Sequence, residues 1–183
     1  MKRDLGQVQM AELAKDGSSL PKLKSRYLTT SYYDLAIAQE QGIWRIELTL
    51  KPLEEPLEKD YTGTFFEEHV EEPIAFSATL NEDQIGWIEL GYEKWNNRMR
   101  VWEFLVKEEF RRIGLGSLLM DLAVRIAKER GARMLVLETQ SCNVPAIAFY
   151  LKQGFRLIGF DSNAYSNEDI IRREVRLEFG LVL

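Results

Sequence analysis

The sequence predicts an α/β domain in which a meander of antiparallel strands precedes a strand–helix–strand crossover, a second helix and a closing hairpin. Two observations support this fold class. Three β-rich segments at 73–80, 84–92 and 98–106 are separated by short turns rich in Asn and acidic residues. Apolar residues then recur at helical spacing over 115–127, and the apolar run at 134–137 is typical of a buried parallel strand.

The N-terminal part of the chain is less clearly patterned. Residues 1–30 are polar and predict a loosely packed arm or a short helix. The segment 31–41 predicts a short helix that ends at Gly42, and 43–50 predicts a strand. A loop rich in Pro and Glu is expected to follow this strand.

The C-terminal part predicts one more helix and two strands. We expect Asn143 to cap the helix, with Pro145 in its first turn and Gly154 after its end. The segments 155–160 and 172–181 then supply the closing hairpin.

Composition narrows the class of protein. Of the 183 residues 45% are hydrophobic and 29% charged, which is typical of a globular protein and predicts one domain over 1–183. The net charge of −5 argues against nucleic-acid binding, and no apolar run reaches the roughly 20 residues of a membrane span. With a single cysteine, Cys142, and no signal-peptide pattern, we expect a cytoplasmic protein.

The segment 54–72 concentrates acidic residues: it holds eight carboxylates against Lys59 and His69. One interpretation is a solvated loop. The other is a lip that attracts a polycationic substrate.

The turn at 111–117 has the composition of an anion-binding site. It connects a predicted strand to a predicted helix, and its glycines, Gly114 and Gly116, let a phosphate approach the backbone N–H groups. A dinucleotide fingerprint is excluded because Leu119 stands where its third glycine belongs. A P-loop is excluded because no Lys follows Gly116.

Two motifs identify a family resemblance. The segment 111–116 fits the Q/R-x-x-G-x-G/A signature of the GNAT acyltransferases, and 143–155 resembles their N-x-x-A-x-x-F-Y…G-F segment. The matching residues are Arg111, Gly114, Gly116, Asn143, Ala146, Phe149, Tyr150, Gly154 and Phe155. The resemblance implies the GNAT fold, a mixed, mostly antiparallel sheet with a central splayed parallel strand pair flanked by helices.

A narrower resemblance concerns the substrate. The segments 95–98, 138–140 and 159–161, together with Tyr165, are similar to the streptothricin acetyltransferases, which inactivate nourseothricin-type antibiotics. This implies acetyl transfer to the amine of the β-lysine moiety of streptothricin. The alternatives are a GNAT enzyme for another cationic amine (an aminoglycoside, a polyamine, a protein lysine or N-terminus) and an acyl-CoA-binding module without turnover. The GNAT resemblance also suggests a homodimer, with the closing strands as candidate interface.

The GNAT resemblance implies acetyl-CoA as cosubstrate. The N–H groups of 112–117 would hold its pyrophosphate, and the edge of 104–106 would pair with its pantetheine arm. The residues expected to bind it are Phe104, Leu105, Val106, Arg111, Arg112, Ile113, Gly114, Leu115, Gly116, Ser117 and Asn143. Of the two arginines, one is expected to be solvated charge at the helix entry.

The same resemblance places the catalytic acid at Tyr150. A phenol with a pKa near ~10 stays protonated at neutral pH and can donate to the thiolate that leaves. The acceptor ammonium must lose a proton, and the candidate bases are Glu103 and Glu89, each of which interrupts an apolar strand, or a water molecule.

Other chemistry-bearing residues are given smaller roles. The residues expected to bind the acceptor substrate are Glu89, Tyr92 and Asp161. His69 is expected to be solvated, and Cys142 has no neighbouring His to make it a nucleophile. One Cys and one His cannot build a zinc site, so we expect no metal.

Overall fold

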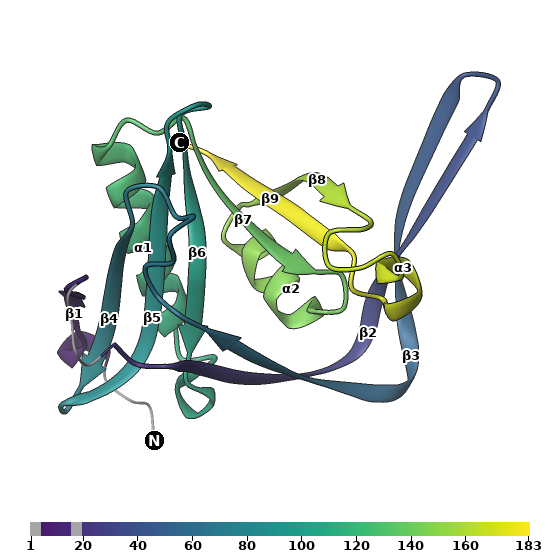
Figure 1. Cartoon of the computed structure of the whole chain (residues 1–183). Helices are drawn as coiled ribbons and strands as arrows, with labels where there is room; N and C mark the ends of the chain where they lie inside the picture. The colour runs from purple at the N-terminus through teal and green to yellow at the C-terminus, as the bar shows by residue number, and fades with distance from the viewer. Residues whose placement is uncertain (1–4, 16–19) are drawn as a thin grey trace. The chain divides into compact units, whose positions relative to one another are not determined.

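The computed structural model describes residues 5–15 and 20–183, which pack as two compact units. The first unit comprises 1–26, 60–137 and 181–183, and the second comprises 27–59 and 138–180. The elements, labelled in Figure 1, are η1 (Leu5–Gln7), β1 (Gln9–Glu12), β2 (Leu23–Glu40), β3 (Ile43–Gly63), β4 (Ile74–Leu80), β5 (Asp83–Glu93), β6 (Arg98–Val106), η2 (Glu108–Phe110), α1 (Leu115–Glu129), β7 (Met134–Gln140), α2 (Val144–Lys152), β8 (Arg156–Asp161), α3 (Asp169–Arg172) and β9 (Arg176–Val182).

The first unit contains the predicted meander. Its strands lie in the order β1-β4-β5-β6-β7, with antiparallel pairs up to β6 and a parallel pair between β6 and β7. Both predicted turns are tight, since Asn81, Glu82 and Asn97 adopt positive φ angles of 49°, 71° and 53°. The predicted mixed, mostly antiparallel sheet is therefore confirmed.

Helix α1 connects the parallel strands and covers one face of this sheet. Its buried side chains follow the predicted helical spacing and are Leu115, Leu119, Met120, Leu122, Ala123, Ile126 and Ala127. The close approach needs a glycine on β5, because a Cβ on Gly86 would lie 3.1 Å from Cδ1 of Leu119. Since side chains alternate along a strand, Gly86 on the helix side puts Trp87 and Glu89 on the opposite face.

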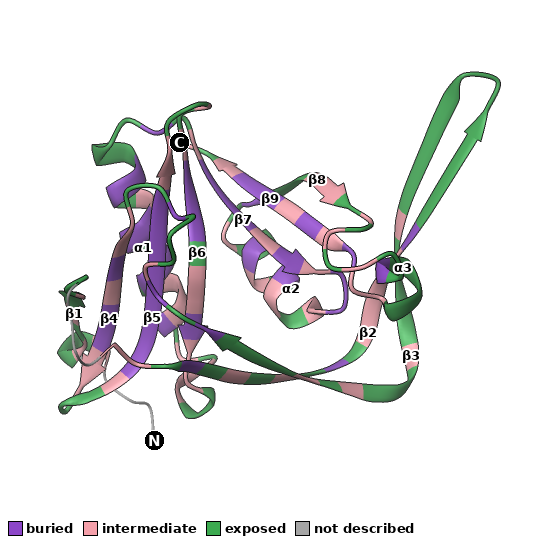
Figure 2. Cartoon of the chain, viewed as in Figure 1, coloured by how far each residue is buried: buried purple, intermediate pink, exposed green. Residues whose placement is uncertain are grey.

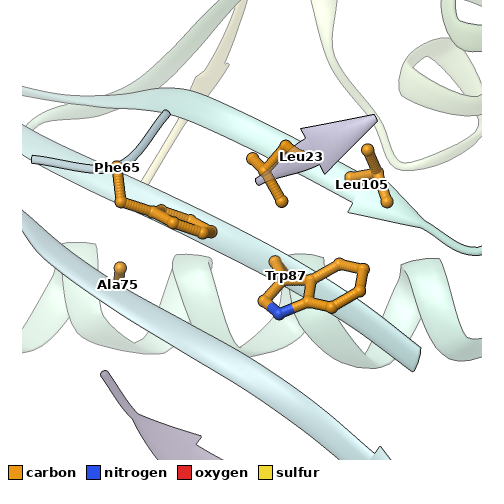
Figure 3. Packing of buried hydrophobic residues seen from close by; sticks show 5 residues of the cluster. All are labelled: Leu23, Phe65, Ala75, Trp87 and Leu105. Carbon is orange, nitrogen blue, oxygen red and sulfur yellow. The ribbon is translucent and has the colours of Figure 1, made fainter. Parts of the chain in front are cut away.

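That opposite face carries a small apolar cluster, shown in Figure 3. Its buried members are Leu23, Phe65, Ala75, Trp87 and Leu105. Leu23 comes from the start of β2 and Phe65 from just after the end of β3, so the two ends of the β2–β3 segment are anchored here. The cluster therefore holds the start of β2 and, through Phe65, part of the acidic segment 54–72 against β5 and β6.

The second unit contains the closing elements. The C-terminal half of β7 is followed by α2, and β8 and β9 form the predicted antiparallel pair. Tyr150, Phe155 and Phe179 are buried and pack against one another, with ring centroids 6.1 and 6.3 Å from that of Tyr150. The short helix α3 between the two strands was not predicted. Among the described residues, no helix is long and apolar enough to cross a membrane.

Two predictions for the N-terminal part are wrong. The segment 31–41 is not a helix but part of β2, and the expected loop after residue 50 is the continuation of β3 to Gly63. The two strands pair through a turn at Gln41 and Gly42, both with positive φ, so cross-strand pairing outweighs local helix propensity. Figure 2 shows that much of this two-stranded ribbon is exposed.

The N-terminal residues 1–30, predicted as an arm or a short helix, contain the short 3-10 helix η1 and two strands where the structure describes them. Strand β1 pairs with β4 from Gln9 opposite Thr79 to Glu12 opposite Phe76, and β2 begins at Leu23. The residues 1–4 and 16–19 of the predicted arm lie outside the described part of the chain.

Candidate active site

The first unit contains a cavity of about 220 Å³ on the sheet face opposite α1. It lies between the end of β3, the loop that follows β3, and the strands β5 and β6. Its lining residues are Tyr61, Thr62, Gly63, Thr64, Glu67, His69, Val70, Glu89, Trp102 and Glu103. Three of them are carboxylates and none is Lys or Arg, so the cavity suits a cationic ligand.

Two of the predicted residues, Glu89 and Glu103, meet in this cavity. They stand directly opposite each other in the antiparallel pair of β5 and β6. Just beyond them the register shifts, so that Leu90 pairs with Val101 and Trp102 has no partner on β5. Carboxylates placed opposite each other repel, so this pairing costs stability and is typical of a functional site.

The Glu103 carboxylate has a proton affinity suited to general base catalysis. Burial raises its pKa to about 7, while the hydroxyl of Tyr61 opposes this by donating a hydrogen bond of 2.5 Å to Oε2. The negative charges of Glu89 and Glu67 raise the pKa further. A base with a pKa near the working pH can accept a proton and release it again in each turnover.

Glu89 is the more deeply buried of the two, with only 1% of its surface exposed. The backbone N–H of Phe66 donates a hydrogen bond of 2.6 Å to its Oε1. Burial raises the pKa of Glu89, and the bond from Phe66 opposes the rise. This arrangement suits a fixed anchor better than a group that exchanges protons with solvent.

The rest of the cavity wall comes from residues to which the sequence analysis gave no individual site role, namely Thr64, Glu67, His69 and Trp102. His69 stacks edge-on against Trp102 with ring centroids 4.9 Å apart, and its Nδ1 lies 3.4 Å from Glu67. The hydroxyl of Thr64 donates a hydrogen bond of 2.6 Å to Glu67. The His69 side chain is 57% exposed, as expected for a solvated residue, yet it lines the cavity. The acidic composition of 54–72 was the only sequence signal for this wall.

The predicted anion cradle begins where α1 begins. Gly114 is the N-cap with φ 103°, and the first helical hydrogen bond runs from Leu118 N to Gly114 O at 3.2 Å. The N–H groups of Leu115 and Gly116 precede it and therefore point out of the helix end. Arg112 is exposed and holds a left-handed φ of 60°, which is uncommon for a residue other than glycine and turns the chain into the cradle.

Arg111 and Arg112 differ in role. The Arg111 guanidinium donates to Val106 O at 3.1 Å, to Arg26 O at 3.0 Å and to Ser25 Oγ at 2.8 Å. These bonds tie the turn to the end of β6 and to the start of β2. The solvated arginine of the pair is therefore Arg112, and the signature residue Arg111 is engaged by the protein itself.

We expect Arg111→Ala to lower the free energy of unfolding by about 2 kcal/mol, because it leaves the half-buried acceptors without their charged donor. Urea unfolding would measure this change. Arg112→Ala is the matched control and is expected to change stability by less than about 0.5 kcal/mol. Equal losses in the two variants would contradict the clamp role of Arg111.

Strand β6 leaves its parallel partner before it reaches the cradle. The register between β6 and β7 within the described chain covers Arg98–Arg100 with Met134–Val136. The expected pantetheine-binding residues 104–106 lie beyond this register, while their pairing with β5 continues to Gly86 opposite Val106. The divergence agrees with the predicted splayed pair, and the Val106 carbonyl is already engaged by Arg111.

The remaining predicted residues lie elsewhere. In the second unit Asn143 caps α2, since its Oδ1 accepts a hydrogen bond of 3.3 Å from Ala146 N, as predicted. Tyr150 is buried in that unit, and burial raises its pKa, so the phenol stays protonated. Asp161 accepts a bond of 2.9 Å from Asn163 N in the turn after β8. In the first unit Tyr92 donates to Asn97 and does not line the cavity.

Two further points concern nucleophiles and metals. Cys142 is buried, and its Sγ lies 3.5 Å from the Tyr27 hydroxyl and 3.8 Å from Gln140 Oε1. Within the described residues, no group of three or more His, Cys, Asp or Glu side chains is arranged to hold a metal ion.

Comparison with known proteins agrees with this geometry. The chain is 30% identical over 158 residues to the streptothricin acetyltransferase of Streptomyces lavendulae, which covers 82% of each chain. It is 33% identical over 132 residues to streptothricin acetyltransferase A of Bacillus subtilis strain 168, covering 71% of this chain and 75% of that one.

Solved structures give the same result for the fold. A nourseothricin acetyltransferase matches with a TM-score of 0.76 at 28% identity, covering 96% of this chain and 98% of that one. A Bacillus anthracis structure assigned to the streptothricin acetyltransferases, in complex with acetyl coenzyme A, matches with a TM-score of 0.77 at 27% identity. The match covers 98% of this chain and 99% of that one. The model of the acetyltransferase (GNAT) family matches residues 33–155. The chain belongs to the GNAT acetyltransferase family.

Proposed function

We propose that this enzyme transfers the acetyl group of acetyl-CoA to an amine of streptothricin. The observation that carries the proposal is the carboxylate-lined cavity, in which Glu103 lies on β6 just before the expected pantetheine-binding segment. The similarity to streptothricin acetyltransferases over most of the chain supports this substrate.

The cavity supplies what a cationic amine needs before it reacts. An ammonium with a pKa near ~10.4 is mostly protonated at neutral pH and is not nucleophilic until a base removes its proton. Glu67 and Glu89 attract the cation, and Glu103 accepts the proton. The His69 and Trp102 rings form a wall against which an aliphatic amine or its charge can pack.

The cradle at the start of α1 is the candidate site for the pyrophosphate of acetyl-CoA. The N–H groups of Leu115 and Gly116 and the positive end of the helix dipole favour an anion there. Glycine is favoured at position 114 because its φ of 103° is one that other residues rarely adopt, and a Cβ there would also lie 3.2 Å from Leu5 Cδ1. The bound thioester supplies the acyl group and a thiolate leaving group.

The transfer step then balances as follows. The neutral amine nitrogen attacks the thioester carbonyl carbon, a C–N bond forms and the C–S bond breaks. The amine's first proton goes to Glu103. The departing sulfur takes a proton from Tyr150, whose burial keeps the phenol protonated. The second proton of the nitrogen is released once the C–N bond has formed, and through solvent it restores the Tyr150 phenol, so that the products are the amide and the free thiol.

An acetyl-CoA consumption assay tests the substrate. We expect turnover with streptothricin and at least about tenfold lower kcat/KM with aminoglycosides, polyamines and lysine peptides. Mass spectrometry of the product should show one acetyl group on the β-lysine moiety. Efficient turnover of another amine without streptothricin would overturn the substrate, and acetyl-CoA binding with no turnover of any amine would favour the non-catalytic alternative.

A further inference from the structure

We infer that Tyr61 and Gly63, at the end of β3, position the Glu103 carboxylate and keep it ionised for the incoming amine. This inference rests on the proposed function, because it assigns a task to the residues that surround the proposed base. It makes Tyr61 and Gly63 positioning residues that act through Glu103.

The contact geometry singles out these two residues. Tyr61 donates its hydroxyl hydrogen to Glu103 Oε2 at 2.5 Å, across a sequence separation of 42 residues. A Cβ built on Gly63 would lie 2.6 Å from both carboxylate oxygens and 2.6 Å from the Tyr61 hydroxyl. Because residues two apart share a face of a strand, β3 presents a donor at 61 and an empty slot at 63 to the same carboxylate.

The charges around Glu103 explain why such a donor is needed. From β5 it faces Glu89, and from the loop after β3 it faces Glu67, which is paired with His69. The positive charge of Lys15 lowers the pKa of Glu89, and no Lys or Arg lines the cavity. Burial and the two like charges favour the protonated acid, which cannot accept a proton. The Tyr61 hydroxyl is the interaction that favours the carboxylate.

The arrangement also leaves one carboxylate oxygen of Glu103 available to accept a proton from the substrate. Oε2 is held by Tyr61, while Oε1 has no protein donor within residues 5–15 and 20–183. Oε1 is therefore the atom that accepts the proton of the ammonium, giving a neutral amine and a neutral carboxylic acid. Tyr61 keeps its own proton throughout this step.

The pH dependence of Tyr61→Phe tests the inference. Removing a hydrogen bond from the ionised form raises the pKa of Glu103, so we expect the acidic limb of kcat/KM to move up by about one pH unit. The variant should then be about tenfold less active than the parent near pH 6 and nearly equal near pH 9. The acceptor's own ionisation is common to both enzymes and cancels in the comparison.

Tyr32→Phe is the matched control for Tyr61→Phe. It removes a hydroxyl from β2 but keeps the ring that stacks beneath Arg173, whose Cζ lies 4.7 Å from the ring centroid. Its pH profile should match that of the parent. An unshifted acidic limb in Tyr61→Phe, or a loss that is uniform across pH, would overturn the role of Tyr61.

Gly63→Ala tests whether the Glu103 carboxylate needs the space beside Gly63, the slot named above. The added methyl group must displace Glu103 or Tyr61, so we expect kcat/KM to fall about 10- to 100-fold while the Kd of acetyl-CoA is unchanged. Parent activity in Gly63→Ala would overturn the slot, and Tyr61→Phe, which is nearly isosteric, decides the case if Gly63→Ala fails to fold.

Glu103→Gln separates this inference from the proposed function. If it is inactive while Tyr61→Phe leaves the acidic limb in place, the inference fails and Glu103 remains the base. If Glu103→Gln keeps parent activity, the assignment of the base fails, and the inference fails with it.

Discussion

Glu103→Gln is expected to lower kcat/KM for streptothricin by about 10²- to 10⁴-fold at pH 7.5. The amide cannot accept a proton, so the acceptor must lose its proton to water before it attacks. The Kd of acetyl-CoA should stay within about twofold of the parent value, because Glu103 lies in the acceptor cavity and not in the cradle at the start of α1. Steady-state kinetics and calorimetric titration would measure the two quantities.

Glu129→Gln is the control for the charge change. Glu129 is exposed at the end of α1, so Glu129→Gln is expected to leave turnover unchanged. A loss of activity in Glu129→Gln equal to that in Glu103→Gln would point to net charge as the cause. Activity of Glu103→Gln within threefold of the parent would exclude Glu103 as the base.

The same substitution is expected to stabilise the fold at alkaline pH. With its pKa raised from 4.5 to about 7, Glu103 binds a proton in the folded chain that the unfolded chain has released. The free energy of unfolding of the parent therefore falls as the pH rises from 4.5 through 7. Gln does not titrate, so the free energy of unfolding of the variant should rise relative to that of the parent over this pH window. The expected difference is on the order of 1 to 2 kcal/mol, a value already reduced for the partial exposure of the side chain.

Urea unfolding at pH 5 and pH 8 would measure this gain. A variant that is inactive but relatively more stable at pH 8 indicates a catalytic role for Glu103, because replacing a structural residue would lower both activity and stability. An equal stability difference at the two pH values would contradict the raised pKa of Glu103.

Tyr150→Phe is expected to lower kcat by about 10²-fold while acetyl-CoA affinity stays within about twofold. The substitution removes only the hydroxyl and keeps the ring that packs against Phe155 and Phe179. Without an acid, the thiolate must leave unprotonated, which raises the barrier to C–S cleavage. Single-turnover kinetics would separate this step from product release.

The control for Tyr150→Phe is Tyr33→Phe, which removes a hydroxyl from a half-buried tyrosine on β2 of the same unit. It should leave kcat unchanged. The catalytic acid would have to be sought elsewhere if Tyr150→Phe turned over at the parent rate, or if both variants lost activity to the same degree.

The second half of the fold could be predicted because its signals are local. The apolar spacing from Leu115, the Asn143 cap and the turn at Asn97 each act over a few neighbouring residues, and α1, α2 and β6 lie where these signals placed them. The helix predicted over 31–41 is wrong because the structure of this segment depends on a non-local contact. Its residues form β2 only because β3 pairs with it, and a partner strand is invisible to local propensity.

By itself, the sequence determined the family, and it predicted the anion cradle at Gly114–Gly116 and singled out the two glutamates that interrupt the apolar strands. The tertiary structure alone decided what surrounds those glutamates. Tyr61 and Glu103 are 42 residues apart in the chain, yet the end of β3 brings the phenol to the carboxylate and leaves room for it only at Gly63. The proposed cofactor cradle is a short continuous turn and leaves a motif, whereas the proposed acceptor cavity is assembled by long-range strand packing, which leaves none.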